Sequence, residues 1–101
     1  MKFDWDIEKA KTNLQTHNVS FEEATFVFSD SWAIQEFDEA HSSLAEKRFT
    51  VIGLSQSRLL RVTYTVTADS NNAEIIRLIS AREAKGLDKI DYERNFNESN
   101  R

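Results

Sequence analysis

The chain has 101 residues, 40% of them hydrophobic and 11% aromatic, which is typical of one folded domain; we place it at residues 1–96, with a frayed tail over residues 97–101. The chain contains no cysteine, which excludes a disulfide framework, a thiolate zinc site and a cysteine nucleophile, and with only two histidines we expect no metal site and no cofactor. No segment has the apolar run of a signal peptide or a membrane span, so we expect a cytoplasmic protein.

The net charge of −4 is distributed unevenly along the chain. Residues 1–46 carry three Lys and ten Asp or Glu, a net charge of −7, whereas residues 47–82 carry six Lys or Arg and two acids, a net charge of +4. The overall acidity argues against generic, sequence-blind binding of nucleic acid. The basic middle segment is mostly arginine, which suits bidentate contacts with phosphate, so a local phosphate-binding patch fits the composition.

The first predicted helix covers residues 7–16. Asp6 precedes it and can accept hydrogen bonds from the free amides of its first turn. Lys9, Asn13 and His17 recur every four residues and therefore share one face of this helix. Folding alone does not require these three residue types in this order, so we interpret the face as a candidate functional surface.

A second predicted helix follows a short break in the chain. Asn18 can adopt the left-handed conformation that ends the first helix. Ser20 and Glu23 have the spacing of a capping box, in which each side chain bonds to the backbone amide of the other. The second helix then runs to residue 29 or 30 and has an apolar face that packs inward, made of Phe21, Ala24, Val27 and Phe28.

The hydrophobic period then changes to two, which predicts β-strands. We expect strands at residues 32–37, 48–54, 59–67 and 74–81, with a polar loop over residues 38–46 and a last helix over residues 85–95. Short links join the last three strands and indicate an antiparallel meander. The order of elements therefore predicts an α+β fold with two N-terminal helices, a four-stranded antiparallel sheet with helices on one face, and a C-terminal helix.

The third and fourth predicted strands each alternate between two faces of the sheet. We expect one face to be buried against the helices, with Leu60, Val62, Tyr64, Val66, Ile76, Leu78 and Ser80 on it. The opposite face carries Arg61 and Arg77, and we interpret it as an exposed phosphate-binding face. The alternative is an ordinary solvated face with surface charges, which is the commoner case for antiparallel sheets.

Several motifs of the chain resemble those of the BrnT toxins. In the first part of the chain the similar residues are Phe3, Trp5-Asp6, Lys9, Asn13, His17, Val19-Ser20-Phe21 and Glu22-Glu23-Ala24. Further along they are Arg48-Phe49-Thr50-Val51-Ile52-Gly53, Tyr64, Ile76-Arg77-Leu78-Ile79-Ser80-Ala81-Arg82 and Tyr92. The resemblance covers about residues 2–95. It departs at Thr16-His17-Asn18, where the family has Lys-His-Gly, and this change removes a cation beside the histidine.

The resemblance implies a type II toxin with a RelE-like fold. Such a toxin is an RNA endonuclease that cleaves without a metal and is inhibited by a BrnA-type antitoxin encoded beside it. The implied partners are therefore an RNA substrate and the antitoxin, in a heterotetramer with the toxin, and no membrane partner is expected.

Metal-free RNA cleavage needs a base for the 2′-hydroxyl, a cation for the phosphorane charge and an acid for the leaving oxygen. We predict catalytic roles for Arg77, Arg61, Arg82 and His17, with Arg77 the first choice because isoleucines flank it on its strand. Contacts with RNA are predicted for Arg48, Lys47 and Lys9. The identity of the base stays open among His17, Glu46 and Tyr64.

Structural roles are the alternative for several of these residues. His17 can complement the helix dipole, Asn13 can pair with the sheet edge, and Tyr64 has the parity of the core face. We expect His41, in the polar loop, to be exposed and inert. Two other functions also stay open: a catalytically inactive protein-binding or regulatory module of the same fold, and a structural partner that binds through its acidic N-terminal half.

Overall fold

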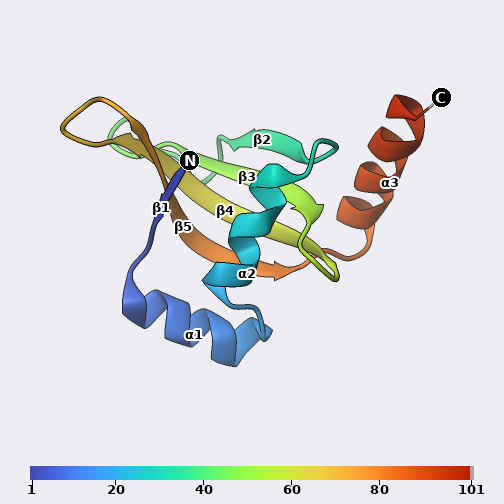
Figure 1. The fold of residues 1–101 in the computed structure, drawn as a ribbon, viewed down its shortest axis with the longest axis horizontal. Helices are drawn as coiled ribbons and strands as arrows, with labels where there is room; N and C mark the ends of the chain where they lie inside the picture. Colours follow the sequence, from blue (N-terminus) through green and yellow to red (C-terminus); the bar gives the residue numbers. More distant parts are fainter. Residues whose placement is uncertain (101) are drawn as a thin grey trace.

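The computed structural model describes residues 1–100, in which five strands form one mixed sheet in the order β1-β5-β4-β3-β2 (Figure 1). The strands are β1 (Lys2–Asp4), β2 (Ile34–Asp38), β3 (Arg48–Leu54), β4 (Leu59–Ala68) and β5 (Glu74–Glu83). The helices are α1 (Ile7–His17), α2 (Phe21–Thr25), the 3-10 helix η1 (Phe26–Ser29) and α3 (Leu87–Ser99). β1 runs parallel to β5, and the other neighbouring pairs are antiparallel. The α+β class is confirmed, but the four-stranded antiparallel sheet is wrong.

Sequence reasoning missed β1 because this strand is too short to show an alternating pattern. Its three residues pair with residues 75–77, at the other end of the chain. The last helix also differs from the prediction, since α3 covers Leu87–Ser99 and so includes residues 97–99 of the expected tail, while Arg101 lies outside the described residues. Within residues 1–100, no helix combines the length and the apolar character needed to cross a membrane.

The helices cover both faces of the sheet, whereas the sequence predicted helices on one face. α1, α2 and η1 pack on one face, and α3 lies at one end of the other (Figure 1). Tyr92 of α3 packs against Ile52 of β3 and Ala84. Its hydroxyl donates a hydrogen bond to Asp30 at 2.7 Å, which ties α3 to the segment after η1. Burial, followed by this contact with Asp30, raises the pKa of Tyr92.

The core lies between the sheet and the layer formed by α1, α2 and η1. Its largest fully buried side chains are Phe21, Leu60, Leu78, Val19, Val27, Val51 and Val62. Tyr64 is only 5% exposed and its ring stacks on Phe49, so its predicted place in the core is confirmed. At Gly53 a Cβ atom would lie 3.1 Å from the carbonyl oxygen of Val27, so the glycine lets η1 approach β3 closely.

A bulge in β5 changes which side chains face the core. Tyr64 pairs with Leu78, but its neighbour Thr63 pairs with Ser80, so Ile79 is an extra residue in the ladder. Beyond the bulge Ala81 enters the core and is 1% exposed, while Ser80 moves to the opposite face. The predicted inward position of Ser80 is therefore wrong. Val66 was also expected inside but is 41% exposed, because it lies beyond the part of β4 that the helices cover.

Asn13 joins α1 to the edge of β5. Its side-chain Nδ2 donates to the carbonyl oxygen of Ala81 at 2.8 Å and to that of Val19 at 2.9 Å, and its Oδ1 accepts from the amide of Ala81 at 3.0 Å. β1 pairs with β5 only at residues 75–77, so at Ala81 the Asn13 amide supplies the hydrogen bonds that a neighbouring strand would make. Asn13 is 6% exposed, which confirms the sheet-edge alternative for this residue.

A second side-chain network ties the turn between β3 and β4 to the start of α2. Ser20 accepts from the amide of Glu23 at 3.0 Å, which is one half of the predicted capping box. The Glu23 carboxylate instead accepts from the Arg58 guanidinium at 2.7 and 2.9 Å and from the Ser55 hydroxyl at 2.7 Å. Arg58 also donates to the carbonyl oxygen of Asn18 at 2.7 Å, so the pair connects two distant turns.

The ion pair between Glu23 and Arg58 makes the stability of the fold depend on pH. The hydrogen bond from Arg58 holds the pKa of Glu23 below its ordinary value of 4.5, so the unfolded chain takes up the proton more readily than the folded one. The stabilisation is complete above that ordinary value and is lost as the pH falls through the lower pKa of the folded state. We therefore expect Glu23→Gln to lower the melting temperature at neutral pH. The difference in melting temperature from the parent protein should narrow as the pH falls below the ordinary pKa of a glutamate.

Thermal denaturation followed by circular dichroism over this pH range would measure the gap. Glu22→Gln is the matched control, because Glu22 is the exposed neighbour on the same helical turn. A gap that stays constant across the range would contradict the assigned role of Glu23.

Candidate functional site

The face of the sheet that points away from α1, α2 and η1, here called the open face, collects arginine and hydroxyl side chains. Strand register places Arg61 of β4 directly opposite Arg82 of β5, and Arg48 of β3 opposite Thr65 of β4. The sequence left the neighbours of Arg61 unassigned, because the bulge at Ile79 sets the register of this part of β5. Three arginines from three different strands therefore lie on one stretch of the open face.

A polar cavity of about 260 Å³ opens on this stretch, and we call it the arginine pocket. Side chains from β2, β3, β4, β5 and the loop after β2 line it: Asp38, His41, Arg48, Thr50, Arg61, Thr63, Ile79 and Ser80. Thr50 is only 4% exposed and forms part of the floor, below the longer arginine side chains. The pocket therefore presents hydroxyl groups at its base and two guanidinium groups at its walls.

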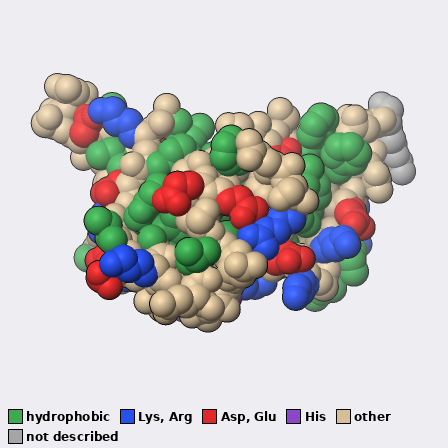
Figure 2. All heavy atoms as spheres, turned by 60° about the horizontal axis from the view of Figure 1, so that its bottom comes forward, with side chains coloured by type: hydrophobic (Ala, Val, Ile, Leu, Met, Phe, Trp, Pro, Cys, Tyr) green, Lys and Arg blue, Asp and Glu red, His purple; other side chains and the backbone are tan. Residues whose placement is uncertain are grey.

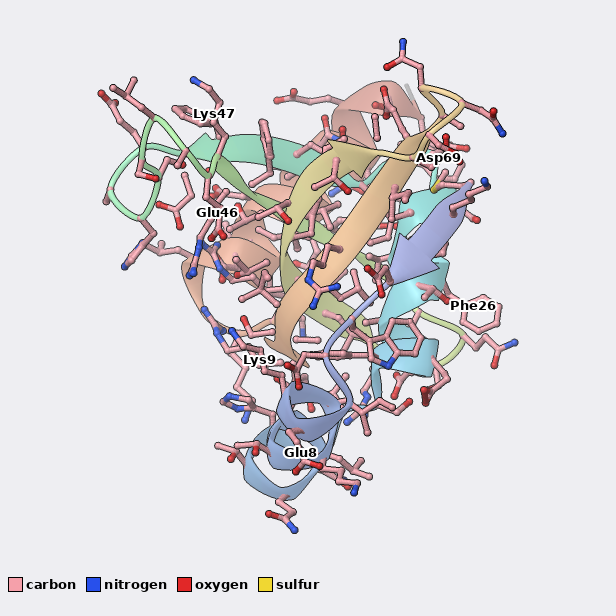
Figure 3. All side chains as sticks on the ribbon, turned by 90° about the vertical axis from the view of Figure 1, so that its left-hand side faces the viewer. Glu8, Lys9, Phe26, Glu46, Lys47 and Asp69 are labelled. Carbon is pink, nitrogen blue, oxygen red and sulfur yellow. The ribbon has the colours of Figure 1, made fainter. Side chains whose placement is uncertain are left out.

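A second cavity of about 460 Å³ lies between α1 and β5, and we call it the helix pocket. Its lining consists of Glu8, Lys9, Thr12, Asn13, Thr16, His17, Ile79 and Ser80. Ile79 and Ser80 line both pockets, so the two meet at this part of β5, and we call the pair the groove. Figure 3 views the sheet from the β1 side, with Glu46 and Lys47 on one side of it, Phe26 on the other and Lys9 on α1 below.

Each open-face arginine already contacts a carboxylate of the chain. Asp88, in the first turn of α3, accepts from Arg61 at 3.1 Å and from Arg82 at 3.4 Å. Glu46 accepts from Arg48 at 2.9 Å, and Asp4 of β1 accepts from Arg77 at 2.6 Å. On the face seen in Figure 2, acidic and basic side chains are likewise interspersed. A bound phosphate would therefore compete with internal carboxylates for the same guanidinium groups.

The structure brings most of the predicted site residues to this groove. His17 and Lys9 line the helix pocket, Arg48 and Arg61 line the arginine pocket, and Arg82 is the cross-strand neighbour of Arg61. Among the described residues, three of the predicted site residues line neither pocket. They are Arg82, Arg77, which Asp4 holds beside β1, and Lys47, whose Nζ atom lies 5.8 Å from the centre of the Phe37 ring.

Sequence reasoning missed three residues of the groove. Ser80 was placed in the core because the bulge cannot be read from an alternating pattern. Asp38 and His41 were treated as loop residues, although the Asp-x-x-His spacing at the end of a strand is the signal that could have identified them. His41 is exposed, as expected, yet it lines the arginine pocket and its ring contacts Asp38.

Two of the open candidates for the base have other roles in the structure. Tyr64 is buried, and burial raises the pKa of its hydroxyl. Glu46 is engaged with Arg48. Among residues 1–100 there is also no group of three or more His, Cys, Asp or Glu side chains placed to hold a metal ion.

Comparison with protein families identifies the chain. The family model described as the ribonuclease toxin BrnT of type II toxin–antitoxin systems matches residues 5–86, most of the 101 residues. The chain belongs to the BrnT family. The BrnT match begins just before α1 and ends at the residue before α3, so it includes every residue that lines the groove. BrnT membership implies a ribonuclease toxin with an antitoxin as its protein partner. A comparison with individual curated proteins finds no match.

Proposed function

We propose that this member of the BrnT family is an RNA endonuclease that binds and cleaves RNA in the groove, in the cytoplasm and without a metal ion. The observation that carries the proposal is that Arg48, Arg61 and Arg82 lie on one stretch of the open face, beside the arginine pocket. That pocket shares Ile79 and Ser80 with the helix pocket. Guanidinium groups can fork onto phosphate oxygens and stabilise the negative charge that develops on the phosphorane. The family supplies the reaction class, and the groove offers a place for it.

The residues have distinct roles in this proposal. In this proposal Arg61 and Arg82, which share Asp88, hold the reacting phosphate once that carboxylate is displaced. Arg48 lines the arginine pocket and Lys9 the helix pocket, so the two can hold flanking phosphates, and His17 can exchange protons in the helix pocket. Arg77 and Lys47 lie outside the two pockets and can extend the contact with the RNA backbone.

The antitoxin can act on the same surface. An acidic segment of a BrnA-type antitoxin would compete with RNA for the open-face arginines, as Asp88 and Glu46 do within the chain. We propose a heterotetramer of the toxin with its antitoxin for the inhibited state.

A second candidate is a protein-binding module of the same fold that lacks catalysis. It is favoured by the internal carboxylate partners of the open-face arginines, which weaken the attraction of the groove for RNA.

RNA cleavage by purified protein in excess EDTA distinguishes the two candidates. We expect cleavage to persist in the chelator and to leave 2′,3′-cyclic phosphate ends, because the proposed chemistry uses only side chains and the 2′-hydroxyl. The variant with both Arg48→Ala and Arg61→Ala, purified in the same way, should leave the RNA intact and controls for contaminating nucleases. Intact RNA with both proteins would contradict the endonuclease and favour the binding module. Cleavage that stops in EDTA would contradict the metal-free mechanism.

A further inference from the structure

His41 lies in the loop after β2 and faces the last residue of that strand. Its Nδ1 atom is 3.1 and 3.0 Å from the two carboxylate oxygens of Asp38, and its backbone amide donates to the first of these oxygens at 3.2 Å. Both residues line the arginine pocket. The histidine that sequence reasoning set aside therefore has a carboxylate partner and a place at the groove.

The loop that carries His41 is fixed at its base by Ser42. The Ser42 hydroxyl donates to the carbonyl oxygen of Asp38 and accepts from the amide of Arg48 at 2.9 Å. Asp38 and Arg48 are also cross-strand partners at the ends of β2 and β3. The imidazole is therefore held by two strands that also supply the walls of the arginine pocket.

The contact with Asp38 determines which nitrogen of the His41 ring carries the hydrogen. The hydrogen bond from His41 lowers the pKa of Asp38, so the carboxylate is ionised in neutral solution and can only accept. Nδ1 must therefore carry the hydrogen, and in the neutral ring Nε2 keeps its lone pair. The His41 side chain is 70% exposed and that of Asp38 only 20%, so the carboxylate orients the ring from behind while the ring stays open to a ligand.

We propose that His41 is the general base of the RNA cleavage reaction and that Asp38 is its positioning residue; this inference rests on the proposed endonuclease function. Nε2 of His41 takes the proton of the 2′-hydroxyl, and the 2′-oxygen forms a bond to phosphorus. The bond between phosphorus and the 5′-oxygen breaks, which leaves a 2′,3′-cyclic phosphate. The 5′-oxygen takes a proton from water, and the imidazolium returns its proton to solvent. Arg61, on the wall of the same pocket, faces the charge on the phosphorane.

The environment of His41 suits this role better than that of the other candidates. Glu46 is engaged with Arg48, and Tyr64 is buried in the core. His17 lines the helix pocket and is not among the residues that line the arginine pocket. His41 combines an exposed ring, an orienting carboxylate and a shared cavity with two arginines.

Two RNA substrates test the proposal. The first is unmodified RNA, which is used to map the cleavage site. The second has sulfur in place of the 5′-oxygen at that site. Sulfur leaves without a proton, so this substrate needs a base but no acid. His41→Asn keeps a side-chain donor toward Asp38 but has no basic nitrogen. We expect it to lower kcat roughly 100-fold or more on both substrates. Asp38→Asn should lower kcat about tenfold or more, with KM and melting temperature unchanged, because it removes the charge that orients the ring.

Leu44→Ala is the control for the loop, since Leu44 is fully exposed in the same segment. Parent-like cleavage of both substrates by His41→Asn would overturn the proposal while leaving the endonuclease intact. A loss on ordinary RNA that the sulfur substrate restores would make His41 the acid and overturn its assignment as the base. If the parent protein cleaves neither substrate, the proposed endonuclease function is contradicted, and the role of His41 as its base is contradicted with it.

Discussion

Asn13→Leu should lower the free energy of unfolding by about 3 kcal/mol or more, because three backbone groups lose their partner at once. The carbonyl oxygens of Val19 and Ala81 and the amide of Ala81 all bond to the Asn13 side chain. Each buried polar group left without a partner costs about 1–3 kcal/mol, and leucine is similar in shape but can neither donate nor accept. In a domain of about 100 residues the melting temperature should fall by roughly 10–20 °C.

Denaturant titration of the variant would measure this change directly. Gln15→Leu is the matched control, because it also replaces an amide by leucine on α1, at an exposed position. We expect the control to stay within about 0.5 kcal/mol of the parent protein. If Asn13→Leu were as stable as the control, the Asn13 bridge to β5 would not hold α1 in place.

Arg61→Ala should lower kcat for RNA cleavage by about 100–1,000-fold, the loss typical of removing one donor that stabilises a charged transition state. Arg61 forms a wall of the arginine pocket, and its side chain is only 28% exposed, so water screens it less than a surface cation. Arg77→Ala should cause a smaller loss, because Asp4 holds that guanidinium beside β1. Single-turnover cleavage with saturating protein would give the rate constants without a contribution from product release.

Arg94→Ala provides the control for a general loss of positive charge. Arg94 is 65% exposed on α3, where its partner is Asp91 at 3.9 Å. We expect its rate constant to match that of the parent protein. Equal losses of rate in the Arg61 and Arg94 variants would indicate a diffuse electrostatic effect instead of a defined phosphate site. A larger loss for Arg77→Ala than for Arg61→Ala would indicate that the reacting phosphate binds closer to β1.

Local signals in the sequence were sufficient to predict the beginning and end of α1. Asp6 accepts from the amides of Glu8 and Lys9, as its place before the helix predicted, and Asn18 ends the helix with φ 57°. Capping depends on a few adjacent residues, so it can be read without knowledge of the fold. The alternation of β4 also placed Arg61 on the exposed side of the sheet, as its position in the arginine pocket confirms.

The features that build the site depend on residues far apart in the chain. β1 exists only through its pairing with β5, and the bulge at Ile79 decides that Ser80 and Arg82 share a face with Arg61. The contact between Asp88 and two arginines requires α3 to pack on the open face, which no local pattern indicates. Sequence therefore predicted residue types that suit the proposed chemistry, while the long-range register decides which of them lie side by side.

The bridge from Asn13 to Ala81 also sets the order in which the groove can form during synthesis. α1 leaves the ribosome early, but its docking partner on β5 emerges only when most of the chain has been made. β1 can pair only after the same strand has been made, since its partners are residues 75–77. A nascent or truncated chain that ends before β5 therefore lacks the residues of this strand that line both pockets, Ile79 and Ser80. The groove can therefore form only after β5 has been synthesised.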